Sequence, residues 1–276
     1  MSKKKTLAEK ADKHILYQKS VQTADTEIEF VLQVYREINA AEPEIFREDF
    51  CGTALLSTEW CRQGNDYRAI GVDLCQDTLD WGMKHNVKPA GKAIAQRVTL
   101  LNENVLSVQT EKTDIVCAFN FSYCIFETRS LMRQYFANVR HSLEEGGLFF
   151  LDLLGGTATT DIVEEERPIE DENFTYIWEQ EYYNPINAHI ECKIHFEFED
   201  GSRLDNAFAY SWRLWSLPEI REILLEAGFS NVRIYWEGFE EDDDPDNEYL
   251  TGTGEYGEVT EIDQQESWLA YIVAER

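Results

Sequence analysis

The chain has 276 residues, 43% of them hydrophobic, which is enough to bury the core of one large domain or two small ones. Its formal net charge of -28 disfavours nucleic acid as a partner, because phosphate backbones would be repelled, although such a charge also simply favours solubility. The apolar runs are shorter than the roughly 18 residues of a membrane span, and the start Met1-Ser-Lys-Lys-Lys-Thr does not resemble a secretion signal. We therefore expect a cytoplasmic protein that binds neither nucleic acid nor membrane.

The first part of the chain predicts a helical arm over residues 1–40, followed by an α/β domain. Ile28, Val31, Leu32 and Tyr35 recur at helical spacing in the arm. From residue 44 to 152, short apolar runs at 45–46, 69–72, 98–101, 115–119 and 147–152 alternate with amphipathic stretches at 54–61, 74–85 and 129–143. This alternation predicts a doubly wound, mostly parallel sheet within residues 41–156.

The pattern changes after Asp152 to strict two-residue alternation, most clearly in residues 190–198, where Glu191 and His195 fall on the polar face. Residues 174–183 and 203–215 are the expected partner strands. The segment 157–213 is thus an antiparallel insertion after the fifth strand, and it leaves the sheet at the carboxyl edge, where ligands bind in open α/β folds. We expect a lid and substrate wall; the alternative is a surface that pairs with a second copy of the chain in a homodimer.

Residues 214–276 complete the α/β domain. Helical spacing at 217–227 is followed by apolar strands at 232–236 and 268–273, which bring the expected sheet to seven strands. Between these two strands, the acidic run 237–248 predicts a solvated loop.

The most informative segment runs from Phe46 to Ser57, where a short strand ends in an acid, turns at Gly52 and opens a helix. Such a turn lets the backbone approach a ligand closely, and the helix start attracts a carboxylate or phosphate. The next strand ends in Asp73, and a carboxylate there can accept both hydroxyls of a ribose. Glu48 and Asp73 together predict a nucleoside-containing cofactor at the carboxyl edge.

The loop distinguishes between two kinds of cofactor. A dinucleotide site needs G-x-G-x-x-G, but only Gly52 is present here, and Glu48 would repel a pyrophosphate. The sequence from Glu48 to Ala54 instead resembles motif I of the class I S-adenosylmethionine-dependent methyltransferases, an acid followed by x-G-x-G-x-G. The chain most resembles a bacterial group of undefined substrate with an R-E-D-F-C-G-T-A loop and an N-F-S-Y segment, here residues 47–54 and 120–123.

This resemblance implies a Rossmann-like methyltransferase sheet and a set of cofactor contacts. Glu48, Cys51 and Gly52 fall on the methionine-binding loop, and Asp73 falls on the ribose acid. Two departures stand out: Phe50 and Ala54 replace glycines, and Arg47 and Asp49 are charged where the strand is usually apolar, as a buried pair or as part of the substrate pocket.

The resemblance also places residues after the third and fourth strands. Asn104 falls where the family meets the adenine amino group, and Val105 would offer its backbone to the ring. Asn120 falls beside the transferable methyl group, and Asn120 and Tyr123 are the expected catalytic residues, which orient the nucleophile.

Substrate contacts are expected from Tyr17 in the arm and from Tyr210 and Trp212 in the insertion. Together with Trp178, Tyr182 and Trp215, the last two suggest an aromatic box for an ammonium group, although aromatics at alternating positions are more often core. No metal site is expected, because the six cysteines form no C-x-x-C pair and the histidines of residues 189–195 lie on a polar strand face.

The sequence therefore predicts an enzyme that transfers a methyl group from S-adenosylmethionine, leaving S-adenosylhomocysteine, to a nitrogen or oxygen of a small molecule. Two alternatives stay open: a nicotinamide-dependent oxidoreductase, which shares the fold and the ribose acid, and a non-catalytic nucleoside-binding or interaction protein.

Overall fold

The computed structural model describes residues 5–239 and 252–276. The chain divides into two compact units, which are described separately below. The larger comprises Ala24–Tyr123, Thr128–Thr157 and Ser216–Arg276, and the smaller comprises Met1–Thr23, Cys124–Glu127 and Ala158–Trp215. Within the described ranges, no helix has the length and apolar character needed to cross a membrane.

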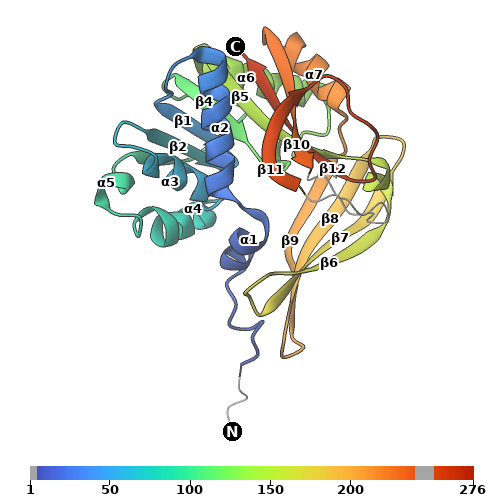
Figure 1. Ribbon diagram of the computed structural model, residues 1–276. Coiled ribbons are helices and arrows are strands. Elements are labelled where there is room, and N and C mark those ends of the chain that lie inside the picture. Colours follow the sequence, from blue (N-terminus) through green and yellow to red (C-terminus); the bar gives the residue numbers. More distant parts are fainter. Residues whose placement is uncertain (1–4, 240–251) are drawn as a thin grey trace. The chain divides into compact units, whose positions relative to one another are not determined.

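The larger unit contains a sheet of eight strands among the described residues, in the order β11-β10-β12-β5-β4-β1-β2-β3 (Figure 1). The pairs from β5 to β3 are parallel, and those involving β12, β10 and β11 are antiparallel. The strands are β1 (Ile45–Asp49), β2 (Arg68–Asp73), β3 (Val98–Asn102), β4 (Thr113–Ala118), β5 (Leu143–Gly155), β10 (Asn231–Phe239), β11 (Gly252–Val259) and β12 (Trp268–Glu275).

The predicted number of seven strands is wrong, because β11 adds an eighth. Its sequence contains Gly252, Gly254 and Gly257, and glycine is depleted in strands, so no strand signal is visible there. The strand forms because β10 offers it an antiparallel partner, with Ile234 opposite Val259. Of the predicted acidic loop, residues 237–239 belong to β10, and residues 240–248 lie outside the described residues.

Helices cover both faces of this sheet, as the doubly wound prediction requires. On β5, the Phe150 ring lies 6.1 Å from that of Phe30 in α2, whereas the Phe149 ring lies 5.7 Å from that of Phe136 in α6. Neighbouring strand residues point to opposite faces, so α2 and α6 pack on opposite sides. The helices are α2 (Ala24–Asn39), α3 (Leu55–Arg62), α4 (Gln76–Gly82), α5 (Lys92–Ala95), α6 (Arg129–Ser142) and α7 (Leu217–Glu226), with a π turn at Met83–Val87 and 3-10 turns at Ser122–Ile125 and Thr157–Thr160.

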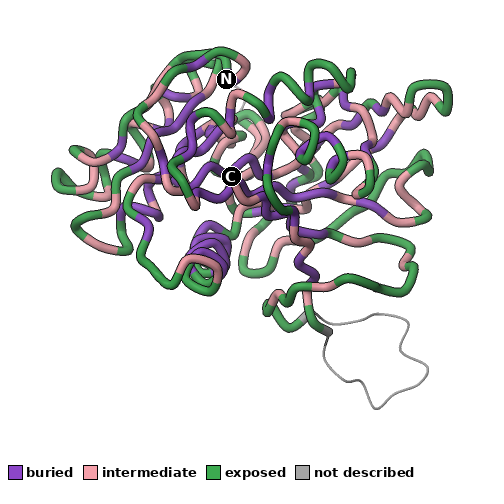
Figure 2. The backbone as a smooth tube through the Cα atoms, turned by 90° about the horizontal axis from the view of Figure 1, so that it is seen from above, coloured by how far each residue is buried: buried purple, intermediate pink, exposed green. Residues whose placement is uncertain are grey.

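The central strands carry much of the buried core, and most exposed positions lie in the connections (Figure 2). Parallel pairing aligns the strand ends: Asp73 lies level with Asn102 on β3, and Glu48 lies level with Cys117 on β4. The residues that follow β1, β2, β3, β4 and β5 therefore come together at one edge.

The smaller unit is a four-stranded antiparallel sheet, β6-β7-β8-β9, with helix α1 (Lys13–Val21). Its strands are β6 (Val163–Pro168), β7 (Phe174–Asn184), β8 (His189–Phe198) and β9 (Arg203–Arg213). The predicted strands in this segment are confirmed. His195, however, is only 4% exposed and does not lie on a wet face, because the β8–β9 register shifts there and Glu179 contacts its ring at 3.0 Å.

Candidate functional site at the carboxyl edge of the large sheet

The loop between β1 and α3 has an alternating backbone conformation. Phe50, Gly52 and Ala54 adopt φ values of 58°, 49° and 54°. Left-handed conformations cost non-glycine residues on the order of 1 kcal/mol or more each, so the surrounding structure must enforce them. It does so through hydrogen bonds from the Cys51 amide to Val72 O (3.0 Å) and from the Ala54 amide to Cys51 O (2.8 Å). Phe50 and Ala54 thus adopt positive φ at the two positions where the motif has glycine.

Asp73 joins the end of β2 to this loop. Its carboxylate accepts hydrogen bonds from the Gly52 amide (2.9 Å) and from the Cys75 amide at the start of α4 (2.7 Å). A Cβ placed on Gly52 would come no closer than 4.0 Å to Thr78 Cγ2, so the space beside this glycine is open. The half-buried carboxylate and the open backbone next to it can receive a ligand with hydroxyl groups.

Cys51 lies under the loop and contacts the neighbouring strand. Its side chain is 2% exposed, and a Cβ on Gly71 would lie 2.8 Å from its sulfur, so β2 needs glycine at that position. Burial raises the pKa of the Cys51 thiol well above its ordinary value, which leaves packing as the role of this side chain. Only the backbone of Cys51 takes part in the hydrogen bonds that shape the loop.

Glu48, near the end of β1, is buried against the start of α3. One carboxylate oxygen accepts from the Ser57 amide (2.9 Å) and the Ser57 hydroxyl (2.5 Å). Burial raises the pKa of Glu48 to about 8, the Ser57 hydrogen bonds oppose this, and the charges of Asp73 and Asp49 add to it. A neighbouring cation would favour the charged form of this acid.

Asn104 and Val105 follow β3 at the same edge. The Asn104 side chain is exposed and accepts from the Leu106 amide (2.9 Å), as in an ordinary Asx turn. Val105 is buried, and its carbonyl accepts from the Asn138 side chain (2.8 Å). The turn holds both residues in place next to the end of β2.

Asn120 follows β4 and is held by the acid on β5. The amides of Asn120 and Phe121, both with φ of 56°, donate to the Asp152 carboxylate at 2.6 and 2.9 Å. Tyr123 has no exposed surface, and its hydroxyl donates to the Asp152 carbonyl (2.7 Å). Burial raises the pKa of Asp152 to about 7, against these amide bonds. Asp152 and Tyr123 therefore fix the turn that presents Asn120.

Glu27 on α2 is a further candidate for this site, and the sequence analysis does not single it out. It is 8% exposed, and burial, followed by the charges of Asp152 and Glu48, raises its pKa to about 8. The available signal was a glutamate on the buried stripe of an amphipathic helix, four residues before Val31. With Glu48 and Asp152 it makes a group of buried acids at the carboxyl edge.

Arg47 and Asp49 form a buried pair and are not part of a pocket. Their side chains have no exposed surface and are joined by bonds of 2.7 and 3.1 Å, and the Tyr135 hydroxyl donates to Asp49 (2.9 Å). Of the two interpretations offered by the sequence, the buried pair is the correct one.

The expected substrate residues Tyr17, Tyr210 and Trp212 lie together in the smaller unit. The Tyr17 ring lies 4.9 Å from that of Phe208, and the rings of Tyr210 and Trp212 stack at 4.4 Å. Burial, followed by the charge and hydroxyl of Tyr17, raises the pKa of Tyr210 well above its ordinary value. In the described residues, no group of His, Cys, Asp and Glu side chains has the arrangement of a metal site.

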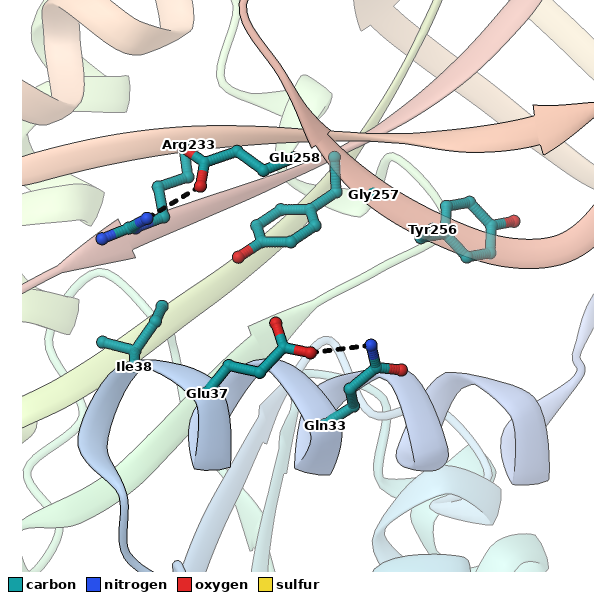
Figure 3. A pocket seen from close by; sticks show the side chains of 8 residues that line it. Gln33, Glu37, Ile38, Arg233, Tyr256, Gly257 and Glu258 are labelled. Atoms are coloured by element: carbon teal, nitrogen blue, oxygen red, sulfur yellow. Dashed lines mark hydrogen bonds and ion pairs between the residues drawn. The ribbon is translucent and has the colours of Figure 1, made fainter.

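Two cavities in the larger unit differ in position. One, of about 420 Å³, lies at the carboxyl edge beside Phe121 and Trp268. The other, of about 330 Å³, lies between α2 and the strands β10 and β11. Figure 3 shows Glu37 and Gln33 of α2 in this second cavity, facing the Arg233–Glu258 ion pair (2.7 Å). Because that ion pair satisfies the guanidinium, the second cavity offers little to an anionic ligand.

Comparison with known proteins supports the fold. No family model and no curated protein sequence matches the chain. Among solved structures, it is similar to an S-adenosylmethionine-dependent methyltransferase from Clostridium acetobutylicum (TM-score 0.65, 17% identity, 95% of this chain and 96% of the other). It is also similar to CalS10, an amino pentose methyltransferase from Micromonospora echinaspora with bound S-adenosylmethionine (0.67, 12%, 95% and 96%). A third is the sugar N-methyltransferase KedS8 of Streptoalloteichus (0.64, 15%, 96% and 93%). The chain has the Rossmann-like fold of these methyltransferases.

Proposed function

We propose that the protein is an S-adenosylmethionine-dependent methyltransferase that acts on a nitrogen or oxygen of a small molecule. The observation that carries the proposal is the loop of residues 48–54: its alternating positive φ values, its bond to Asp73 and the open space at Gly52. A loop with this backbone path and no side chain at Gly52 lets the backbone approach a ligand closely. The similar solved structures include methyltransferases of amino pentoses and sugars, in agreement with a small acceptor.

The residues at the edge fit the parts of this cofactor. Asp73 would accept the ribose hydroxyls, and the open backbone at Cys51 and Gly52 would lie close to the methionine end of the cofactor. Glu48, with Glu27 and Asp152 near it, would balance the positive ammonium and sulfonium groups. Asn104 and Val105 would contact the adenine, and Asn120 would lie near the methyl group.

The cofactor brings an already activated methyl group, so the chain needs mainly to bind, orient and exclude water. Asp152 and Tyr123 hold the backbone that presents Asn120, which makes them positioning residues. We assign acceptor contacts to Tyr17, Tyr210 and Trp212, because these aromatics gather in one cluster of the smaller unit.

A nicotinamide-dependent oxidoreductase is the second candidate, since it shares the ribose acid. The loop argues against this candidate. A pyrophosphate would need free backbone amides at the start of α3, but the buried Glu48 carboxylate lies there and already accepts the Ser57 amide.

Calorimetric titration of the purified full chain distinguishes the two. We expect S-adenosylmethionine and S-adenosylhomocysteine to bind and NAD not to bind. Binding of NAD without binding of either sulfur compound would overturn the proposal. If none of the three compounds binds, a non-catalytic protein is favoured.

A further inference from the structure

The loop of residues 50–54 is held at a second point, by the far end of α4. This helix begins beside Asp73, where the Cys75 amide donates to that carboxylate (2.7 Å), and it ends at Gly82. A Cβ on Gly82 would lie 2.6 Å from the Thr53 carbonyl carbon and 2.8 Å from its Cα, which is closer than non-bonded atoms allow. The two main chains therefore touch, and only glycine fits at position 82.

A side chain from the following turn binds the same part of the loop. The Asn86 side-chain amide donates a hydrogen bond to the Thr53 carbonyl (2.8 Å). Gly82 and Asn86 are four positions apart, a spacing that places two residues on one face of a helix. Gly82 thus allows the loop to approach, and Asn86 fixes it by a hydrogen bond.

The helix widens at this contact. Met83–Val87 is a π turn, and the Lys88 amide donates to the carbonyl of Met83, five residues before it (3.0 Å). Such turns are rare within helices and occur frequently at functional sites. Here the π turn begins directly after Gly82 and contains Asn86, so it coincides with the contact to the loop.

The helical bonds of α3 begin one residue after Thr53. The Thr58 amide donates to the Ala54 carbonyl (3.1 Å). The Ser57 amide could reach the Thr53 carbonyl if the helix began one residue earlier, but it donates to Glu48 (2.9 Å). The donor for the Thr53 carbonyl therefore comes from the π turn instead of from α3.

We propose that Gly82 and Asn86 are positioning residues for the cofactor, which act through Thr53 on the loop at its methionine end. The inference rests on the proposed function. Gly52 is then held on both sides, because its own amide donates to Asp73 (2.9 Å) and the next residue is fixed by the π turn. Neither positioning residue needs to touch the cofactor, so their effect should appear in its affinity.

Asn86→Leu tests the hydrogen bond, because leucine has a similar size and no donor. Asn39→Leu is the matched control: the Asn39 side-chain amide donates to the Gly146 carbonyl (3.1 Å) near the start of β5, at the opposite edge of the sheet. Both variants should lose some stability in urea melts. Only Asn86→Leu should weaken the binding of S-adenosylhomocysteine to the full chain, by roughly tenfold in calorimetry.

A shorter ligand separates a local effect from a general loosening of the fold. 5′-Methylthioadenosine keeps the nucleoside and the sulfur but lacks the amino-acid end of the cofactor. Because Thr53 lies in the loop that we assign to that end, Asn86→Leu should change the affinity for this ligand by less than about twofold. An equal loss of affinity for both ligands would overturn the proposal.

Gly82→Ala tests the close approach of the two main chains. The added methyl group would displace Thr53, so the affinity for S-adenosylhomocysteine should fall at least as far as in Asn86→Leu. Gly147→Ala is the control, because a Cβ there would also meet backbone, 2.9 Å from the Glu144 oxygen, but at the opposite edge of the sheet. If Gly82→Ala is poorly folded, Asn86→Leu decides the question.

Amide hydrogen exchange keeps this inference separate from the proposed function. The Gly52 and Ala54 amides are hydrogen-bonded (2.9 and 2.8 Å), and Asn86→Leu should speed their exchange by roughly tenfold in the protein without ligand, whereas Asn39→Leu should not. Unchanged exchange in Asn86→Leu overturns the positioning role even when S-adenosylhomocysteine binds. Failure of S-adenosylhomocysteine to bind the folded chain overturns the proposed function, while the exchange rates still decide whether the π turn holds the loop.

Discussion

The Gly52 amide donates a hydrogen bond to the Asp73 carboxylate, so the end of β2 holds the loop that follows β1 (2.9 Å). Asp73 thus shapes the loop, and under the proposed function the remaining lone pairs of its carboxylate would accept the ribose hydroxyls. Its removal should therefore affect binding more than overall stability.

Asp73→Ala should weaken S-adenosylhomocysteine binding by roughly 1–3 kcal/mol, the cost of losing a charged hydrogen-bond partner. Asp77→Ala, an exposed acid in the first turn of α4, is the control and should bind normally. Calorimetry measures both. Unchanged affinity in a folded Asp73→Ala protein would remove Asp73 from the cofactor site.

Ala54→Gly should cost less stability than the same change at Ala69. Both side chains are almost fully buried, but Ala54 has φ of 54° whereas Ala69 lies in β2. Glycine relieves backbone strain only at Ala54, so the two free energies of unfolding should differ by about 1 kcal/mol or more. Equal losses in urea melts would show that Ala54 is not strained.

Cofactor binding should release protons at pH 7. Glu48 has a pKa of about 8 and is mostly protonated in the free protein, and a bound cation favours its ionised form. Affinity for S-adenosylmethionine should therefore rise from pH 6.5 to 8, by roughly up to tenfold for each pH unit. Titration in buffers of different ionisation enthalpy counts the protons. Glu48→Gln should reduce the number, and an unchanged number would contradict this assignment.

Glu27→Gln should stabilise the free protein at high pH. The pKa of Glu27 is about 8 when folded, against an ordinary value of 4.5, so the folded state keeps a proton that the unfolded state has lost. The stability that Glu27 contributes is thus present at low pH and falls from about pH 4.5 to pH 8.

Glutamine avoids that loss, so the gain at pH 8.5 should be on the order of 2 kcal/mol and should shrink toward pH 5. Glu29→Gln on the exposed side of the same helix removes the same charge and controls for general repulsion. The prediction is wrong if both variants respond alike in denaturant melts.

Tyr210→Phe and Trp212→Leu should lower turnover while leaving the affinity for S-adenosylhomocysteine unchanged. Tyr210 stacks on Trp212 and shares a hydrogen bond with Tyr17, so both changes disturb one aromatic cluster. Turnover is measured as release of S-adenosylhomocysteine in the presence of a panel of small amines and alcohols. Normal turnover in both variants would make this cluster purely structural.

Periodicity predicted those parts of the chain whose signals are local. The apolar stripe of α2 and the acids at the ends of β1 and β2 were visible in short windows of sequence. β11 was not, because its glycines hide a strand that forms only against β10. Glu27 was missed because the acids that neighbour it, Glu48 and Asp152, come from distant strands.

The loop of residues 50–54 has a further consequence for how such sites evolve. Phe50 and Ala54 adopt left-handed conformations in a loop that the neighbouring strand holds, because the amides of Cys51 and Gly52 donate to Val72 O and to the Asp73 carboxylate. Part of the information that shapes this loop thus lies about twenty residues downstream, in β2. Substitutions in β2 can alter the loop without touching it, while the loop itself can exchange glycine for larger residues and keep its path.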